Sequence, residues 1–192
     1  MAAILPHVRE GDAIRNPFNG ETFVFTHVTE DPASARFDLL IEPGGMTTGT
    51  GRHHLHPFAD EEFTVRHGWL RVSMAGRWHM LGPGETLRVS KGTPHLFRNG
   101  HAGETLVATR FVPGQQFLRF FLNMALSVTR HPEWYDARGE PPLALQALVL
   151  HAFHGHGYSA DHPVWLQRAV FAALAPAARR KGYTLQVPPR PQ

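Results

Sequence analysis

The stretch "HHLHPFADEEFTVRHG" (residues 53–68) places three histidines within four positions and three acidic residues shortly after them. In a β-strand, residues i and i+2 project from the same face, so His54 and His56 direct two imidazoles to one side. If the chain turns at Pro57 and folds back, Glu61 begins the return strand and points at the same spot. Two nitrogens and a carboxylate oxygen on adjacent strands suit a divalent transition metal, although a polar rim with satisfied hydrogen bonds would contain the same residues.

A second stretch, "GETLRVSKGTPHLFRN" (84–99), predicts a strand, a Gly-Thr-Pro turn and then a short strand that begins at His95. Together the two stretches resemble the cupin family. Its first motif has two histidines separated by one residue, then three or four intervening residues and a glutamate, then six intervening residues and a glycine. Here these positions are His54, His56, Glu61 and Gly68. Its second motif contains two glycines, a histidine and an asparagine, which here are Gly84, Gly92, His95 and Asn99.

The sequence departs from the cupin pattern at two turn positions. Ser90 stands where proline is usual, and the glycine expected before the first histidine is displaced to Gly49 or Gly51. The resemblance covers roughly residues 12 to 113. It implies that His54, His56, Glu61 and His95 bind one divalent transition metal ion, with Fe(II) favoured and Mn, Ni, Zn or Cu also compatible with this ligand set.

Composition supports a β-rich fold and excludes several classes of protein. The 192 residues are 42% hydrophobic, with 18 Gly and 16 Pro, as expected for a chain with many turns. The absence of cysteine excludes disulfides and thiolate metal sites. The formal charge of +3 is not arranged in an aromatic-basic stripe, so no nucleic-acid partner is expected. With no apolar run of membrane-spanning length and no apolar segment typical of a signal peptide, we expect a cytoplasmic protein with no membrane partner.

The chain is expected to divide into a cupin β-barrel with the metal site (1–113) and a C-terminal helical extension (114–192). The first part has short alternating segments between turns, at 21–28, 35–42, 62–74, 85–90 and 104–112. The second part has helical periodicity at 117–128, 143–153 and 163–175. The predicted fold class is therefore mainly β, a double-stranded β-helix (jelly-roll or cupin) barrel with an α-helical extension. A DNA-binding helix-turn-helix is not favoured, because the linker is long and the last helix lacks a polar face.

Several further side chains are candidates for the site. Strand alternation predicts a substrate pocket lined by Phe63, Val65, Leu70, Val72, Met74 and Phe97, although core packing would use the same residues. Tyr135, Tyr158 and Arg110 are each able to orient a substrate. His53 is predicted to face away from the metal, and the loop histidines His151, His154, His156 and His162 are predicted to be solvated.

The function that we expect is that of a metal-dependent enzyme acting on a small organic substrate, most simply a non-haem dioxygenase. Glu61 would be a ligand and, on loosening from the metal, a catalytic base. A redox-neutral isomerase, cyclase or lyase and a non-catalytic metabolite-binding module remain alternatives, because the fold hosts all of these. The helix at 117–128 has a single polar stripe of Arg119, Asn123 and Ser127 to meet water, so we expect the helices to pack on the barrel and partly at a homodimer interface.

Overall fold

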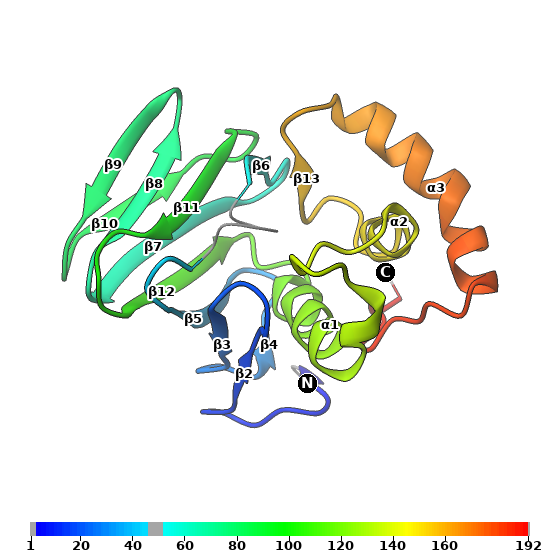
Figure 1. The fold of residues 1–192 in the computed structure, drawn as a ribbon, viewed down its shortest axis with the longest axis horizontal. Helices are drawn as coiled ribbons and strands as arrows, with labels where there is room; N and C mark the ends of the chain where they lie inside the picture. The colour runs from blue at the N-terminus through cyan, green and yellow to red at the C-terminus, as the bar shows by residue number, and fades with distance from the viewer. Residues whose placement is uncertain (1–2, 46–51, 192) are drawn as a thin grey trace.

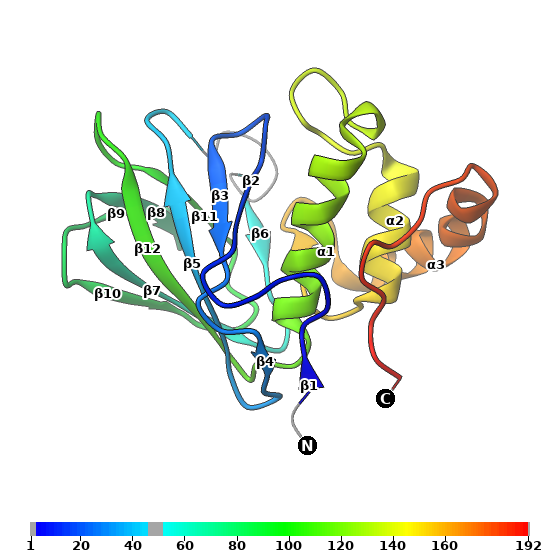
Figure 2. The same ribbon diagram turned by 90° about the horizontal axis from the view of Figure 1, so that it is seen from below.

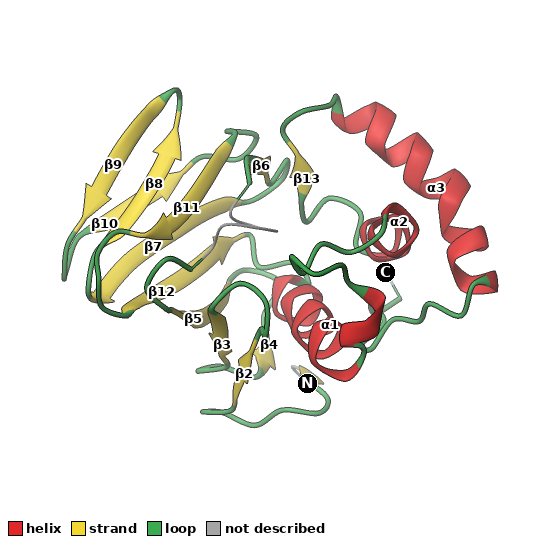
Figure 3. Ribbon diagram, viewed as in Figure 1, coloured by secondary structure: helices red, strands yellow, loops and turns green. Residues whose placement is uncertain are grey.

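Two antiparallel sheets dominate the first part of the chain in this computed structural model, which describes residues 3–45 and 52–191 (Figures 1 and 3). The larger sheet has the order β10 (Thr86–Val89), β7 (Asp60–His67), β12 (Thr105–Val112), β5 (Ala35–Ile41), β3 (Glu21–Val24) and β2 (Ala13–Arg15). The smaller has the order β13 (Tyr158–Ser159), β6 (His54–Leu55), β11 (His95–Asn99), β8 (Leu70–Met74) and β9 (Arg77–Leu81). A separate ribbon pairs β1 (Ala3–Ile4) with β4 (Thr29–Glu30). The fold is the double-stranded β-helix that the sequence predicts.

Alternation along β7 shows how the sequence directs side chains into the barrel. Glu61, Phe63 and Val65 are buried, whereas the residues between them are partly exposed. The strand ends in a turn at Gly68, which has a φ of +78°. A Cβ atom at this position would lie 2.5 Å from the carbonyl oxygen of Glu104, so only glycine fits between β7 and β8. The glycine of the first motif is thus required by the close approach of the backbone.

The helices form layers beside the barrel (Figure 2). α1 (Phe117–Arg130) contacts β2 and β5, while α2 (Leu143–Ala152) packs on α3 (Val164–Arg180), and a short 3-10 helix (Pro132–Trp134) follows α1. Phe37 of β5 lies 4.8 Å from Phe121 of α1 between ring centroids. Phe111 of β12 stacks on Phe117 at 4.0 Å. The barrel and α1 therefore share one apolar core, to which α2 also contributes.

The predicted polar stripe of α1 does not meet water, so that expectation is wrong. Asn123 and Ser127 are buried. The Asn123 side-chain oxygen accepts hydrogen bonds from the backbone N–H groups of Gln186 (2.8 Å) and Val187 (3.1 Å), and the Tyr135 hydroxyl donates to Ser127 (2.9 Å). The C-terminal segment lies over this face of α1, which periodicity within the helix alone does not reveal.

An ion-pair cluster holds that C-terminal segment in place. The Glu30 carboxylate pairs with Arg119 of α1 at 2.8 Å and with Arg190 at 2.5 Å. Burial would raise the pKa of Glu30, but hydrogen bonds from the two guanidinium groups and their charges lower it overall. Glu30 thereby joins β4, α1 and the C-terminal segment. No helix within the described ranges is long and apolar enough to cross a membrane.

Candidate metal centre

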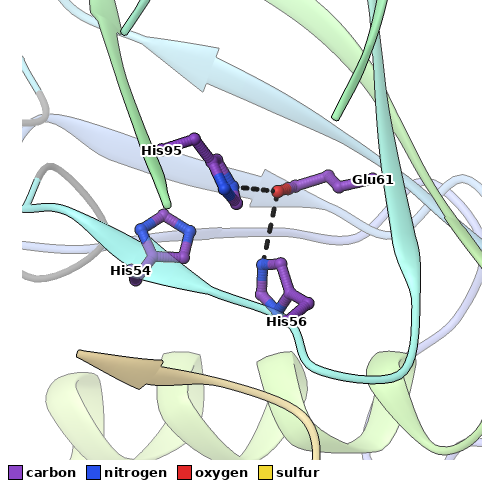
Figure 4. Close-up of side chains that lie close together, drawn as sticks. All are labelled: His54, His56, Glu61 and His95. Atoms are coloured by element: carbon purple, nitrogen blue, oxygen red, sulfur yellow. Dashed lines mark hydrogen bonds and ion pairs between the residues drawn. The ribbon is translucent and has the colours of Figure 1, made fainter. Parts of the chain in front are cut away.

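The four residues of the predicted ligand set converge between the two sheets (Figure 4). His54 lies on β6 and His95 begins β11, and the two residues are direct partners across that strand pair. His56 follows β6. Glu61 reaches the cluster from β7, which belongs to the other sheet. The expectation that histidines and glutamate lie on adjacent strands is therefore wrong: the chain crosses from one sheet to the other between His56 and Glu61, so that the ligands approach from both sides.

The donor atoms of the cluster lie close together and are shielded from water. One potential ligand atom from each of the four residues lies within 4.8 Å of the other three. Glu61 Oε2 is 2.7 Å from His95 Nε2 and 3.3 Å from His56 Nε2. His56, Glu61 and His95 are buried, and His54 is half-buried. The arrangement fits the space that a single ion would occupy.

Backbone carbonyls fix the orientation of all three imidazoles. Nδ1 of His54 donates to Arg52 O (2.9 Å) and Nδ1 of His95 to Thr93 O (2.9 Å). Nδ1 of His56 donates to the carbonyl oxygen of His156. Since a carbonyl only accepts, each Nδ1 carries a hydrogen and each Nε2 is directed into the cluster. In metal sites, hydrogen bonds of this kind to the other ring nitrogen orient the histidines toward the ion.

The electrostatics of the cluster also suit a cation. Burial lowers the pKa of His54 to about 3, with help from His95 and His56, so that His54 is neutral. Burial would raise the pKa of Glu61, but its contacts with His56 and His95 lower it strongly, so that it is a carboxylate. Burial would lower the pKa of His95, but its hydrogen bond and charge interaction with Glu61 raise this pKa overall. A metal ion would replace the proton held between His95 and Glu61.

A buried ring nitrogen provides an independent test of the fit. His56 Nε2 is buried, and apart from its 3.3 Å contact with Glu61 Oε2 it has no well-aligned hydrogen-bond partner among the described residues. Such an atom is costly unless a partner satisfies it. Three imidazole nitrogens and one carboxylate oxygen form a set that divalent first-row transition ions accept. The residues present therefore fit a metal ion, and the set does not select one element.

A cavity of about 330 Å³ opens beside the cluster, between β3, β6 and the helices α1 and α2. His54 and His56 border one end of it. The walls are largely apolar and come from both parts of the chain, including Phe23, Phe120, Phe121, Met124, Leu145 and Val149. Its volume is at the lower end of the range for small-molecule sites. The helical extension thus forms much of the wall of the space next to the candidate metal centre.

The residues predicted to line the substrate pocket do not border this cavity. All six belong to or pack against the close-packed apolar core: Phe63, Val65, Leu70, Val72, Met74 and Phe97. Tyr135 and Tyr158 do line the cavity, whereas Arg110 does not. His53 is exposed, as its position in the strand predicts. Gly49 and Gly51 lie outside the described residues.

Two residues near the cluster were not predicted from the sequence. His156, expected to be solvated, is buried: its Nδ1 donates to Phe153 O (3.1 Å), and its Nε2 accepts from the backbone N–H of Gln116 (3.2 Å). Burial lowers its pKa to about 4. Glu21 lies at the start of β3 and lines the cavity. Its position two residues before Phe23, on the apolar face of a predicted strand, was a clue to its burial.

Comparison with known proteins relates part of the barrel to a known family. A barrel of two antiparallel sheets that gathers three histidines and a glutamate defines the class of double-stranded β-helix proteins with a potential metal site. Residues 37–109 match the family model for the cupin domain, so this part of the chain is similar to a cupin domain. No curated protein sequence matches it significantly.

Several solved structures resemble the barrel. KdgF from Halomonas sp. is 18% identical with a TM-score of 0.47, and the match covers 58% of this chain and 96% of that one. A sugar phosphate isomerase of the cupin superfamily from Silicibacter pomeroyi is 18% identical with a TM-score of 0.41, covering 48% and 59%. The nucleoside dehydratase Pac13 is 14% identical with a TM-score of 0.43, covering 55% and 80%. Similarities at this level carry no inference about activity.

Proposed function

We propose that this protein is a metal-dependent enzyme that acts on a small organic molecule, and that it is a non-haem dioxygenase. The observation that supports this proposal is the location of the His54–His56–Glu61–His95 cluster at the end of a largely apolar cavity. A site that only stabilised the barrel would not need a space of about 330 Å³ beside it. Apolar walls favour both an organic substrate and dioxygen, which is itself apolar.

The side chains divide the work of such a site between binding and orientation. His54, His56 and His95 would hold the ion through Nε2, and Glu61 would hold it through its carboxylate. When bound, a divalent iron ion supplies Lewis acidity and an electron for the activation of dioxygen. The lowered pKa of Glu61 makes its carboxylate a good ligand and a weak base, so base catalysis by Glu61 would require it to leave the metal.

The cavity would position the substrate. Phe120, Phe121 and Val149 provide apolar contacts for its body. The hydroxyl of Tyr135 lies at the wall and donates to Ser127. Enclosure by α1 and α2 would restrict the entry of water and thereby protect reactive intermediates from side reactions.

Anaerobic purification followed by elemental analysis and oxygen-electrode measurements would test the proposal. The protein would be loaded with Fe(II), and neutral aromatic and enolic compounds would be added in turn. Oxygen uptake that depends on both iron and substrate is the expected result, and it should be lost in His95→Ala. Turnover without oxygen would instead indicate an isomerase, cyclase or lyase, and ligand binding without turnover would indicate a metabolite-binding module.

A further inference from the structure

Glu21 is a buried carboxyl group in the cavity wall to which the proposed function assigns no role. The alternating burial of β3 directs Glu21 and Phe23 inward, and Glu21 is only 4% exposed. Both residues border the cavity that His54 and His56 close at one end. The carboxyl group therefore lies in the space that a substrate would occupy.

Few polar groups satisfy this carboxyl group. The side-chain N–H of Asn19 donates to Glu21 Oε2 over a long 3.4 Å, and the Glu21 backbone N–H donates to Asn19 Oδ1 (3.0 Å). No arginine, lysine or histidine of the described ranges forms an ion pair with it. Burial, with a contribution from the charge of Glu61, raises the pKa of Glu21 to about 7. A purely structural role would be better served by an apolar side chain, because an incompletely bonded buried carboxyl group is destabilising.

The charged side chains around the cavity do not favour an anionic ligand. Among the described residues that line it, Arg52 is the only arginine or lysine. Its guanidinium is largely exposed and pairs with Glu140 at 3.1 Å. The deeper walls are apolar, and the carboxyl groups of Glu21 and Glu61 interact electrostatically. An anion at this depth would meet negative charge without a paired cation from a side chain.

We propose that Glu21 is a specificity-determining residue that hydrogen-bonds a hydroxyl or carbonyl group of an uncharged, largely apolar substrate and selects against anionic ones. As an acid it donates to a carbonyl, and as a carboxylate it accepts from a hydroxyl. The substrate body then packs on α1 and α2. This inference rests on the proposed function only in taking the cavity as the substrate site. What the inference adds is the substrate class of that site, namely uncharged and largely apolar molecules.

Binding of two matched probes would test the inference without turnover. Benzyl alcohol and benzoate have similar sizes and differ in charge. Their affinities would be measured by calorimetry and ligand-detected NMR at pH 8 on zinc-loaded protein, because zinc has no redox chemistry. The variants would be Glu21→Gln and, as a matched control, Glu104→Gln, which changes an exposed glutamate before β12. Val149→Phe would fill the cavity and should abolish binding of both probes.

The expected result is that benzyl alcohol binds the unmodified protein and that Glu21→Gln increases the ratio of benzoate to benzyl alcohol affinity by about tenfold or more, since a charge at close range in a buried site is removed. Glu104→Gln should leave the ratio unchanged. If Glu21→Gln does not fold, Glu21→Leu removes the same charge and suits the apolar surroundings.

An unchanged ratio in a folded Glu21 variant would overturn the inference, as would failure of benzyl alcohol to bind or binding that persists in Val149→Phe. These outcomes are separable from those of the oxygen experiment. A protein that consumes no oxygen but shows the ratio change retains the inference and loses the dioxygenase proposal. Oxygen uptake together with an unchanged ratio of benzoate to benzyl alcohol affinity would support the dioxygenase proposal and overturn the inference about Glu21.

Discussion

The carbonyl oxygen of His156 accepts a hydrogen bond from Nδ1 of His56, a residue that precedes it by 100 positions. The loop after α2 thereby determines which nitrogen of His56 faces the candidate metal centre. The strand that follows this loop, β13, pairs with β6, which carries His54. The helical part of the chain thus supports the ligands from outside the barrel.

Replacement of His156 should weaken metal binding although its side chain touches no ion. His156→Ala removes the bonds to Phe153 and Gln116 that hold the loop, so the His56 ring loses a fixed orientation. Loss of such outer support typically costs about 10–100-fold in metal affinity. Competitive zinc titration would measure it, with His154→Ala, an exposed neighbour, as the control. Equal affinities in the two variants would show that the loop does not orient His56.

Replacing the ligands should remove the metal and leave the barrel folded, because its core is apolar. His54→Ala, His56→Ala and His95→Ala should each strip the ion in elemental analysis while circular dichroism is retained. Glu61→Gln should reduce occupancy less and turnover severely. His53→Ala, next to the cluster but exposed, is the matched control. Full metal retention in the double variant His54→Ala, His56→Ala would exclude this site.

The clustering of His54, His56, Glu61 and His95 was predictable, because these residues belong to two short motifs with fixed spacing. The cavity was not. Strand alternation placed Phe63 and Phe97 inside the barrel correctly, but it does not tell whether an interior is packed or hollow. The cavity forms where β3 meets α1 and α2, and contacts so distant in sequence leave no periodic pattern. For the same reason the sequence predicts a solvated side chain for the loop residue His156, which is buried in the structure.

Glu21 should make the stability of the metal-free protein depend on pH. Its pKa rises from the usual 4.5 to about 7 on folding, so the folded protein binds the proton more tightly. The resulting stability is complete below the unfolded pKa and is lost as pH rises through the folded one. Between about pH 5 and 8, the free energy of unfolding of the unmodified protein should fall by up to about 3 kcal/mol relative to Glu21→Gln. Urea unfolding of chelator-treated protein measures this difference, and a difference that does not vary with pH would contradict the pKa assignment.

Removal of the Glu30 carboxylate should loosen the C-terminal segment. Glu30→Gln leaves Arg119 without its charged partner in a mostly buried position, and we expect a loss of about 1–3 kcal/mol in the free energy of unfolding. The pair Arg15–Glu42 is more exposed, so Glu42→Gln should reduce the free energy of unfolding less than Glu30→Gln does. Limited proteolysis should also release the C-terminal residues sooner in Glu30→Gln. Equal effects of the two substitutions would show that the ion-pair cluster at Glu30 does not hold the C-terminal segment in place.

We expect a homodimer, with α3 contributing to its interface. Trp165 is 71% exposed, and Leu166 and Val170 of the same helix are also exposed. Contiguous apolar groups on a surface favour association. Light scattering should give the mass of two 21.5 kDa chains, and Trp165→Glu should shift it toward one. A single-chain mass at micromolar concentration for the unmodified protein would contradict the homodimer.

The boundary of the cupin match has a consequence for how this protein can change. The four clustered side chains all lie within residues 37–109, whereas Phe120, Leu145 and Val149 of the cavity wall lie beyond it. Under the proposed function, the residues for reaction chemistry and many of those for substrate preference therefore lie in separate stretches of the sequence. Mutations in α1 and α2 can reshape what enters the cavity while the ligand motifs stay intact, which makes these two helices the place to direct a library for altered substrate range.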